Sequence, residues 1–92
     1  MGKVLYRLRE RVDANNSPVV LKEMDDLTGD GSVDIIIDFA SNKYISSSGL
    51  RAILYIQKKV AKAGGSQTLV NVSQAVKEIF DVTGYSRFLS IE

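Results

Sequence analysis

The sequence contains neither cysteine nor histidine, and these two absences remove several classes of function. Without cysteine the chain can form no disulfide and no thiolate metal site, which agrees with a reducing, cytoplasmic location. Without histidine it lacks the most common metal ligand and the most common general base. We therefore expect no resident metal, no cofactor and no enzymatic activity.

Long apolar runs and a large excess of one charge are also missing. The apolar runs reach only four or five residues, whereas a membrane helix needs about 20, and no signal peptide is visible at the start. Twelve basic and eleven acidic side chains give a net charge of +1, which does not favour direct nucleic-acid binding. We expect a cytoplasmic protein without membrane insertion.

What the chain does contain is an alternation of strand-like and helix-like segments within one domain, residues 1–92. A content of 45% hydrophobic residues is enough for one modest core. Apolar periodicity predicts strands and helices in the order strand 3–10, helix 18–27, strand 33–39, helix 47–63, strand 67–72, helix 74–83 and strand 88–91. This order predicts an α/β fold with a mostly parallel four-stranded sheet packed with three to four helices.

Short local signals define the ends and surroundings of these elements. Ser17 is predicted to be the N-cap of the first helix, with Pro18 at its first position, and Ser73 is predicted to cap the last helix. A glycine follows each helix and is expected to end it. Strand 33–39 contains three consecutive isoleucines, which is typical of a central strand buried on both faces.

Three arginines, Arg7, Arg9 and Arg11, alternate along the first predicted strand. The alternation predicts that they line one face or one edge of the sheet. Charges on an edge strand commonly discourage pairing between sheets, and a partner-binding role is the alternative interpretation.

Two other chemistries fit the sequence poorly. The segment from Asp26 to Asp34 has the oxygen side chains of a calcium loop, with Gly31 at the sixth position, but Ile37 occupies the twelfth position, where a glutamate is needed. A turn between a helix and a strand is predicted there. A serine nucleophile in segment 46–48 would need a base, and no lysine follows at the S-x-x-K spacing.

The segment Ser46-Ser47-Ser48-Gly49 stands where a buried strand has ended and the longest predicted helix begins. One N-cap needs only one hydroxyl, and a glycine in the first turn costs about 1 kcal/mol relative to alanine. Such a glycine indicates that something approaches the backbone closely. A phosphate on one of these serines would face free N–H groups and the positive end of the helix dipole. The pattern alone leaves two interpretations open, a simple N-cap and a phosphorylation switch.

With these segments identified, the sequence resembles the STAS domain family over nearly its whole length. Segment 44–50, Y-I-S-S-S-G-L, matches the family's F-I-D-S-S-G-L and is the most specific part. Segment 33–39 matches the central V-V-L-D-L strand, and segment 11–14 matches the G-x-L/V-D sequence after the first long strand. Further matches lie at 64–65, 69–70, 76–80 and 83–84. This is the fold of bacterial anti-sigma factor antagonists and of the cytoplasmic tails of sulfate transporters.

The resemblance to the antagonist branch implies a mechanism. In that branch the unmodified protein binds an anti-sigma factor that is also a serine kinase, and this binding frees the sigma factor for transcription. The kinase then phosphorylates the first serine of the S-S-G-L segment, here Ser47, the complex dissociates, and a phosphatase resets the system. ATP is bound by the partner. The implied contact patch consists of Asp13, Ser46, Ser47, Ser48, Gly49 and Leu50.

Two departures from the family pattern bear on these expectations. Ser46 stands where the family usually has aspartate, so Ser46 is the second candidate for the phosphorylated serine. Family members also often open with an additional strand, and only a few residues precede Lys3 here. The first edge strand is therefore expected to be shortened or missing, or to be supplied by a second copy. We expect a monomer or a weak homodimer.

Two other functions stay open at this point. One is a STAS scaffold without phosphorylation, such as an accessory subunit of a transporter or of a stress-signalling complex. The other is a small module that binds an anion, a nucleotide or a lipid at the same helix N-terminus. The serine at position 47 favours the phosphorylation switch, because the resemblance implies that many non-switching relatives lose it.

Overall fold

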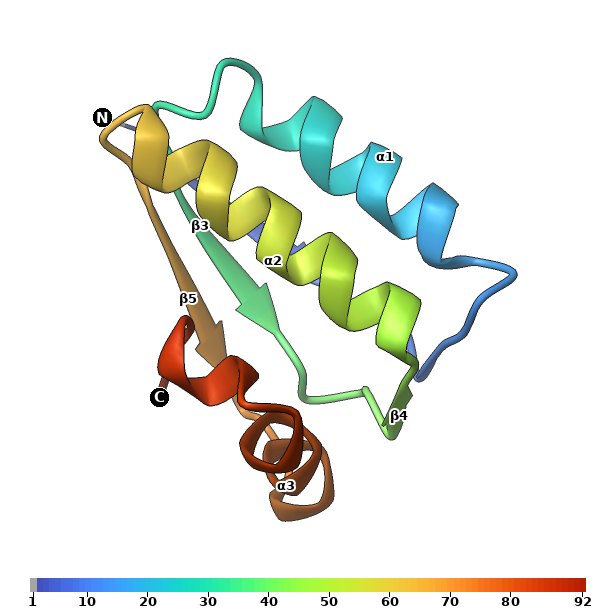
Figure 1. Ribbon diagram of the computed structural model, residues 1–92. Helices are drawn as coiled ribbons and strands as arrows, with labels where there is room; N and C mark the ends of the chain where they lie inside the picture. Colours follow the sequence, from blue (N-terminus) through green and yellow to red (C-terminus); the bar gives the residue numbers. More distant parts are fainter. Residues whose placement is uncertain (1) are drawn as a thin grey trace.

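The computed structural model describes residues 2–92 and is built around a parallel sheet of four strands (Figure 1). The strands lie in the order β1 (Gly2–Arg7), β3 (Val33–Asp38), β5 (Ser66–Val70) and β6 (Ser90–Ile91), and every neighbouring pair is parallel. The predicted α/β class with a four-stranded parallel sheet is confirmed. Met1, which the predicted domain 1–92 included, lies outside the described residues.

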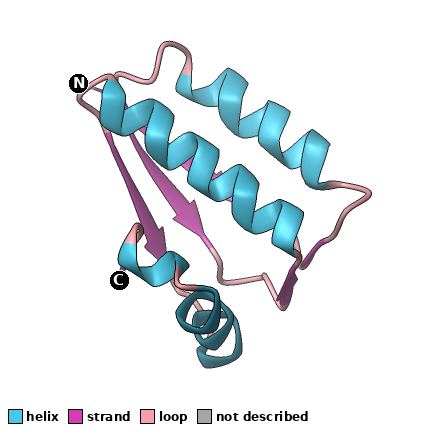
Figure 2. Ribbon diagram, in the orientation of Figure 1, coloured by secondary structure: helices cyan, strands magenta, loops and turns pink. Residues whose placement is uncertain are grey.

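Three helices and one short 3-10 helix surround this sheet. Helices α1 (Ser17–Thr28) and α2 (Ser47–Lys62) lie side by side over one face of the sheet (Figures 1 and 2). Helix α3 (Gln74–Thr83) and the 3-10 helix Tyr85–Arg87 lie beyond the carboxyl ends of β3 and β5. Among residues 2–92 there is no helix with the length and hydrophobicity that crossing a bilayer requires.

The core lies between the sheet and its helices. Apolar side chains from both layers are almost completely buried there: Val20, Met24, Ile35, Ile37, Ile53, Ile56, Val60 and Leu69. At the end of the sheet, Phe39 and Phe80 pack edge to face, with ring centroids 5.9 Å apart and an interplanar angle of 71°. This aromatic pair attaches α3 to the end of the central strand.

Within residues 2–92 no helix covers the second face of the sheet (Figure 1), so the prediction that strand 33–39 is buried on both faces is wrong. Ile35 and Ile37 point toward the helices and are fully buried, whereas Ile36 points to the other face and is partly exposed. On that face Ile36 lies in register between Leu5 and Thr68 of the two neighbouring strands. The side chain of Ile36 is therefore partly shielded from solvent by residues of the neighbouring strands and not by a helix.

The first strand ends earlier than predicted. β1 stops at Arg7, and the chain then forms a second short strand, β2 (Arg11–Val12). β2 pairs in parallel with β4 (Tyr44–Ile45), and the pairs are Arg11 with Tyr44 and Val12 with Ile45. This two-stranded ribbon was not predicted, because two residues are too few to show a periodic pattern.

The break in the first strand also separates the three arginines, which were predicted to share one face or edge. Arg7 stays on β1, with its Nε atom 3.7 Å from Asp38. Arg9 reaches α1, where its guanidinium donates to Glu23 at 2.9 Å. For all three to share one face, a single continuous strand would have had to extend as far as Arg11.

Helix ends follow the predicted signals, with a shift of one residue at α1. The Ser73 hydroxyl accepts the N–H of Val76 at 3.2 Å, and Gly84, at a φ of 80°, ends α3. At α1 the N-cap is Asn16, so the prediction of Ser17 as the N-cap is wrong. Ser17 is the first helical residue, and its hydroxyl bonds to a serine of α2 instead of to its own helix.

Candidate phosphorylation and partner-binding site

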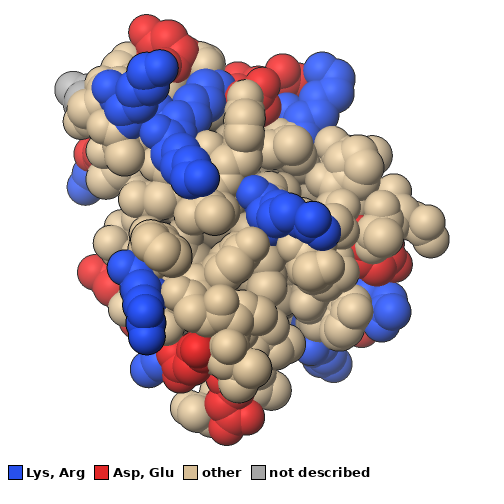
Figure 3. All heavy atoms as spheres, viewed as in Figure 1, with Lys and Arg blue, Asp and Glu red and all other residues tan. Residues whose placement is uncertain are grey.

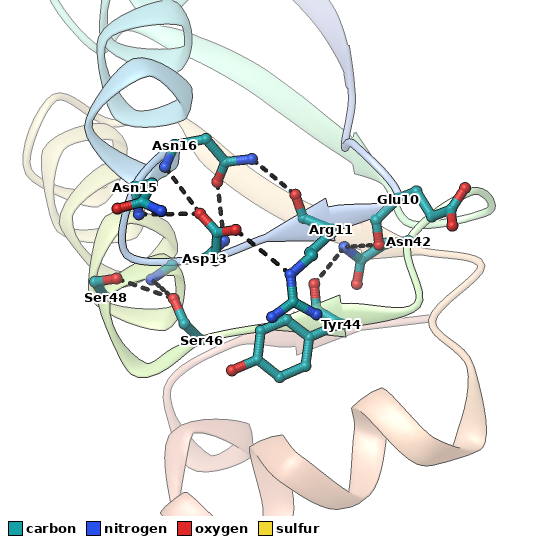
Figure 4. A network of polar contacts seen from close by, with 10 residues as sticks. Glu10, Arg11, Asp13, Asn15, Asn16, Asn42, Tyr44, Ser46 and Ser48 are labelled. Carbon is teal, nitrogen blue, oxygen red and sulfur yellow. Dashed lines mark hydrogen bonds and ion pairs between the residues drawn. The ribbon is translucent and has the colours of Figure 1, made fainter.

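The β2–β4 ribbon brings the beginnings of α1 and α2 together (Figure 4). The ribbon is prolonged by a backbone bond in which the N–H of Ser46 donates to the carbonyl of Val12 at 2.8 Å. Each strand leads directly into the residues that precede a helix. Asp13 and the serine segment therefore lie next to one another, although they are more than thirty positions apart in the chain.

Asp13 is held in a fixed orientation by the turn that follows it. Its Oδ1 atom accepts the backbone N–H groups of Asn15 at 2.9 Å and Asn16 at 3.0 Å. Its Oδ2 atom lies 3.4 Å from Nε of Arg11. The Asn16 N–H, followed by the Asn15 N–H and Arg11, holds the pKa of Asp13 below its ordinary value, so the carboxylate is ionised at neutral pH.

Asn16 closes this turn and was not among the predicted site residues. Its side-chain oxygen accepts the N–H of Asp13 at 2.9 Å, and its side-chain nitrogen donates to the carbonyl of Arg11 at 2.8 Å. The sequence signal for this role was the Asp-x-Asn-Asn composition, because Asp and Asn side chains commonly bond to nearby backbone in turns.

Two of the three serines are occupied by structural hydrogen bonds. The Ser46 hydroxyl accepts the N–H of Gly49 at 3.2 Å and thereby caps α2. The Ser46 and Ser48 hydroxyls lie 2.9 Å apart, and the Ser17 hydroxyl donates to Ser48 at 3.0 Å. This chain of three hydroxyls ties the first turns of α1 and α2 together.

Ser47 differs from its two neighbours. It occupies the first position of α2, its side chain is exposed, and its hydroxyl has no hydrogen-bond partner within residues 2–92. Within the serine segment, therefore, Ser47 presents the hydroxyl that is free to react.

Gly49 and Leu50, which belong to the predicted contact patch, lie beneath it. A Cβ atom on Gly49 would be 2.7 Å from Ile45 Cγ1 and 2.8 Å from Val12 Cγ1. The close approach expected at this glycine is therefore made by the protein's own β2–β4 ribbon. Leu50 is only 2% exposed and packs in the core. Neither residue presents a side chain to solvent.

Arg11 and Tyr44 form a border of the patch that the sequence did not identify. The guanidinium carbon of Arg11 lies 4.4 Å from the centre of the Tyr44 ring, and both side chains are substantially exposed. The two side chains stack because their residues pair in the β2–β4 ribbon, and no pattern of neighbouring residues in the sequence predicts that pairing. Arginine and tyrosine are among the residue types enriched at the energetic centres of protein interfaces.

The patch offers little to a metal ion. Its carboxylate, Asp13, is already bonded to two backbone N–H groups. In the described part of the chain no three acidic side chains lie close enough together to hold a metal ion. The arrangement instead combines one exposed hydroxyl without a hydrogen-bond partner within residues 2–92, one fixed negative charge and an exposed arginine–tyrosine pair.

Comparison with known proteins gives this geometry a context. The family model of the STAS domain matches residues 2–92. The chain belongs to the STAS domain family. Its STAS relatives include the anti-sigma-B factor antagonist of Bacillus subtilis (strain 168), which is 31% identical over 80 residues, or 87% of this chain and 72% of that protein. The anti-sigma F factor antagonist of Paenibacillus polymyxa is 25% identical over 91 residues, or 98% of this chain and 78% of that protein.

Solved structures support the same STAS fold. The unphosphorylated form of the anti-sigma factor antagonist SpoIIAA superimposes with a TM-score of 0.82 at 22% identity, over 99% of this chain and 80% of that chain. The phosphorylated form of SpoIIAA, a cell fate determinant of Bacillus, gives a TM-score of 0.74 at 21% identity, over 98% and 82% of the two chains. At these identities the likeness shows the fold.

Proposed function

We propose that this STAS domain is an anti-sigma factor antagonist that is released from its partner when Ser47 is phosphorylated. The antagonist role is supported by relatives that carry this name. The choice of Ser47 is supported by one observation above all, its free and exposed hydroxyl between two serines whose hydroxyls are bonded.

In the unmodified state the patch of Asp13, Ser46, Ser47 and Ser48 binds an anti-sigma factor that is also a serine kinase. Arg11 and Tyr44 at its border contribute the large, partly exposed side chains that such interfaces favour. Binding occupies the anti-sigma factor and frees the sigma factor. The antagonist itself supplies no catalytic group, and the ATP is bound by the kinase.

Phosphorylation then ends the interaction. The kinase transfers the terminal phosphoryl group of ATP to Ser47, so that the Oγ–H bond is replaced by an Oγ–P bond, ADP forms and the proton leaves to solvent. The phosphate adds about −1.5 to −2 charges beside Asp13, and a partner would have to remove water from these charges in order to stay bound. A phosphatase restores the hydroxyl and the binding state.

Ser46 remains the second candidate, and its contacts count against it. Phosphorylation of Ser46 would occupy the oxygen that caps α2 and that bonds to Ser48. The loss of such a cap costs about 1 kcal/mol. Phosphorylation of Ser47 disturbs no hydrogen bond of its side chain within residues 2–92.

The test is phosphorylation by the serine-kinase anti-sigma factors encoded in the same genome, each purified and incubated with ATP and this chain. Intact mass and peptide mapping are expected to show one phosphate on the wild type, located at Ser47, and none on Ser47→Ala. Ser73→Ala is the matched control, because Ser73 also stands at the start of a helix. Binding measured by calorimetry is expected to be strong for the unmodified chain and lost after phosphorylation.

Two results would contradict the proposal. If Ser47→Ala still gains a phosphate and Ser46→Ala does not, the modified residue is Ser46. If none of these kinases binds or modifies the wild type, the switch is absent, and a STAS scaffold without phosphorylation becomes the better interpretation.

A further inference from the structure

The outer surface of α2 carries one line of exposed side chains that begins at Ser47. Along the helix it continues through Arg51, Tyr55, Lys58 and Lys62, at the spacings of three and four residues that place side chains on the same face. The helix contains no aspartate or glutamate. Figure 3 shows basic side chains lying over the course of α2. The free hydroxyl therefore stands at the end of a positively charged ridge.

Arg51 is the member of this ridge closest to Ser47. It is exposed, and within residues 2–92 it has neither an ion-pair partner nor a hydrogen-bond partner. It lines a groove of about 350 Å³ between α1 and α2, together with Ser17, Pro18, Ser48 and Tyr55. Lys59, in contrast, is already bound to Asp25 of α1 at 2.7 Å. Arg51 is thus a cation without an assigned partner beside the serine segment.

The spacing of Ser47 and Arg51 suits a pair between a negative and a positive group. Residues four apart on a helix have Cβ atoms roughly 5–6 Å from each other, and the favourable order has the negative group nearer the N-terminus. A phosphoserine at position 47 would satisfy this order and would also face the positive end of the helix dipole. The planar guanidinium can bind two phosphate oxygens at once.

Resting on the proposed function, we propose that Arg51 binds the phosphate on Ser47 within the same chain and so stabilises the phosphorylated state. In the same patch the charges of Asp13 and Arg11 are already paired with each other. The first turn of α1, residues 17–20, faces Ser48 and carries no charge. Phosphorylation would therefore change two side chains, because it adds an anion at Ser47 and removes a free cation at Arg51.

The test installs phosphoserine at position 47 by genetic encoding, so that no kinase is needed. Phosphorus NMR then follows the second ionisation of the phosphate, which ordinarily occurs near pH 6. The chain with Arg51 is compared with Arg51→Gln and with the matched control Lys58→Gln. The control removes the same charge from the same ridge, at a position about 16 Å along the helix axis from residue 47, whereas Arg51 is about 6 Å away.

A pair between Arg51 and the phosphate predicts an ionisation midpoint about 0.2 to 0.7 of a pH unit lower in the chain with Arg51 than in Arg51→Gln. Lys58→Gln is expected to match the chain with both cations, and about 1 M salt is expected to reduce the difference. Equal midpoints with and without Arg51 would overturn the inference. So would equal shifts in the two variants, which would indicate the general field of the ridge.

These outcomes are separable from those of the kinase experiment. A chain that no kinase modifies would refute the proposed function and leave the phosphorus titration unaffected. If the chain is phosphorylated but the ionisation midpoint of its phosphate is the same with and without Arg51, only the proposed pair between Arg51 and the phosphate is refuted.

Discussion

Helices α2 and α3 begin in the same way, and a comparison of their first turns shows what is special about α2. Ser46 and Ser73 are both N-caps, and each hydroxyl accepts the N–H of the third helical residue at 3.2 Å. That third residue is Gly49 in α2 and Val76 in α3. One serine is therefore sufficient to cap a helix in this protein, and the additional hydroxyls of α2 need another explanation.

The positions that follow the caps are the ones that differ. The first helical residue is Ser47 in α2 and Gln74 in α3. Four residues later stand Arg51 in α2 and Glu78 in α3. A negative group at the first position would meet a cation in α2 and an anion in α3. In α2 the cap is Ser46, and the proposed phosphorylation falls on a different residue of the same turn, Ser47.

The largest effect on stability is expected when the third residue of α3, Val76, is replaced by glycine, the residue at the third position of α2. Val76 is fully buried, so Val76→Gly removes a core side chain and places a glycine within a helix. We expect a loss of about 3 kcal/mol in the free energy of unfolding. Urea denaturation with an unchanged m-value would measure it, and a loss below about 1 kcal/mol would show that α3 contributes little to the core.

A side chain added at the third position of α2, in Gly49→Ala, is expected to have a somewhat smaller effect on stability. The Cβ of Gly49→Ala would press on Ile45 and Val12 at under 3 Å, and both of these side chains are buried. Overpacking typically costs 1–3 kcal/mol and alanine regains about 1 in helix propensity, so we expect a net loss of about 1.5 kcal/mol. Gly2→Ala is the control, because no atom lies within 4 Å of its added Cβ. If Gly49→Ala left the free energy of unfolding unchanged, the β2–β4 ribbon would be able to shift and make room for the added Cβ atom.

The two caps are expected to differ only slightly. Ser73→Ala should cost about 1 kcal/mol, the usual value for a lost N-cap. Ser46→Ala should cost a few tenths of a kcal/mol more, because Ser48 also loses a hydrogen-bond partner. Parallel thermal and urea denaturation would compare them. If Ser73→Ala proved the more costly, the hydroxyl chain between α1 and α2 would contribute nothing to stability.

Removing the free hydroxyl is expected to leave stability unchanged. Ser47→Ala and its counterpart Gln74→Ala both alter exposed first-turn residues, so each should stay within about 0.5 kcal/mol of the wild type. Ser47→Ala should nevertheless lose all phosphorylation. A clear loss of stability in Ser47→Ala, measured by urea denaturation, would show that this hydroxyl has a structural role after all.

The last prediction concerns the ionisation of Asp13, which lies beside the serine segment of α2 (Figure 4). Because its pKa is lowered in the folded state, its contribution to stability is present above the unfolded value of about 3.9 and is lost as the pH falls through the lower folded value. The backbone N–H signals of Asn15 and Asn16 are expected to titrate in NMR with a midpoint below 3.9. Asp13→Asn should abolish this transition. A midpoint at or above 3.9 would mean that the turn does not hold the carboxylate.

The sequence predicted those parts of the fold that depend on local signals. Ser73 and Gly84 define α3, and the alternation of elements predicts the parallel sheet. The open face of the sheet could not be predicted in this way, since a run such as Ile35 to Ile37 looks the same whether one face or both are covered. The β2–β4 ribbon was missed because its strands have two residues each.

The family resemblance predicted that Asp13 and the serine segment form one patch, and their role in it stays a prediction. Proximity of Asp13 to the serines came from a family resemblance, and the structure brings them together through the ribbon. The Ser48 hydroxyl is bonded partly because Ser17, which stands 31 positions earlier in the chain, donates to it. No local pattern contains such a contact.

The parallel sheet also has a consequence for how the chain folds. Leu5 pairs with Ile36, Ile36 with Thr68 and Thr68 with Ser90, so no two neighbouring strands of this sheet form a hairpin. Every strand pairing must therefore close a long loop of chain, and parallel sheets fold more slowly than helical bundles for this reason. The sheet cannot be completed until residues 90–91 have left the ribosome. Until then part of the surface of the neighbouring strand is exposed, and aggregation can compete with folding at that stage.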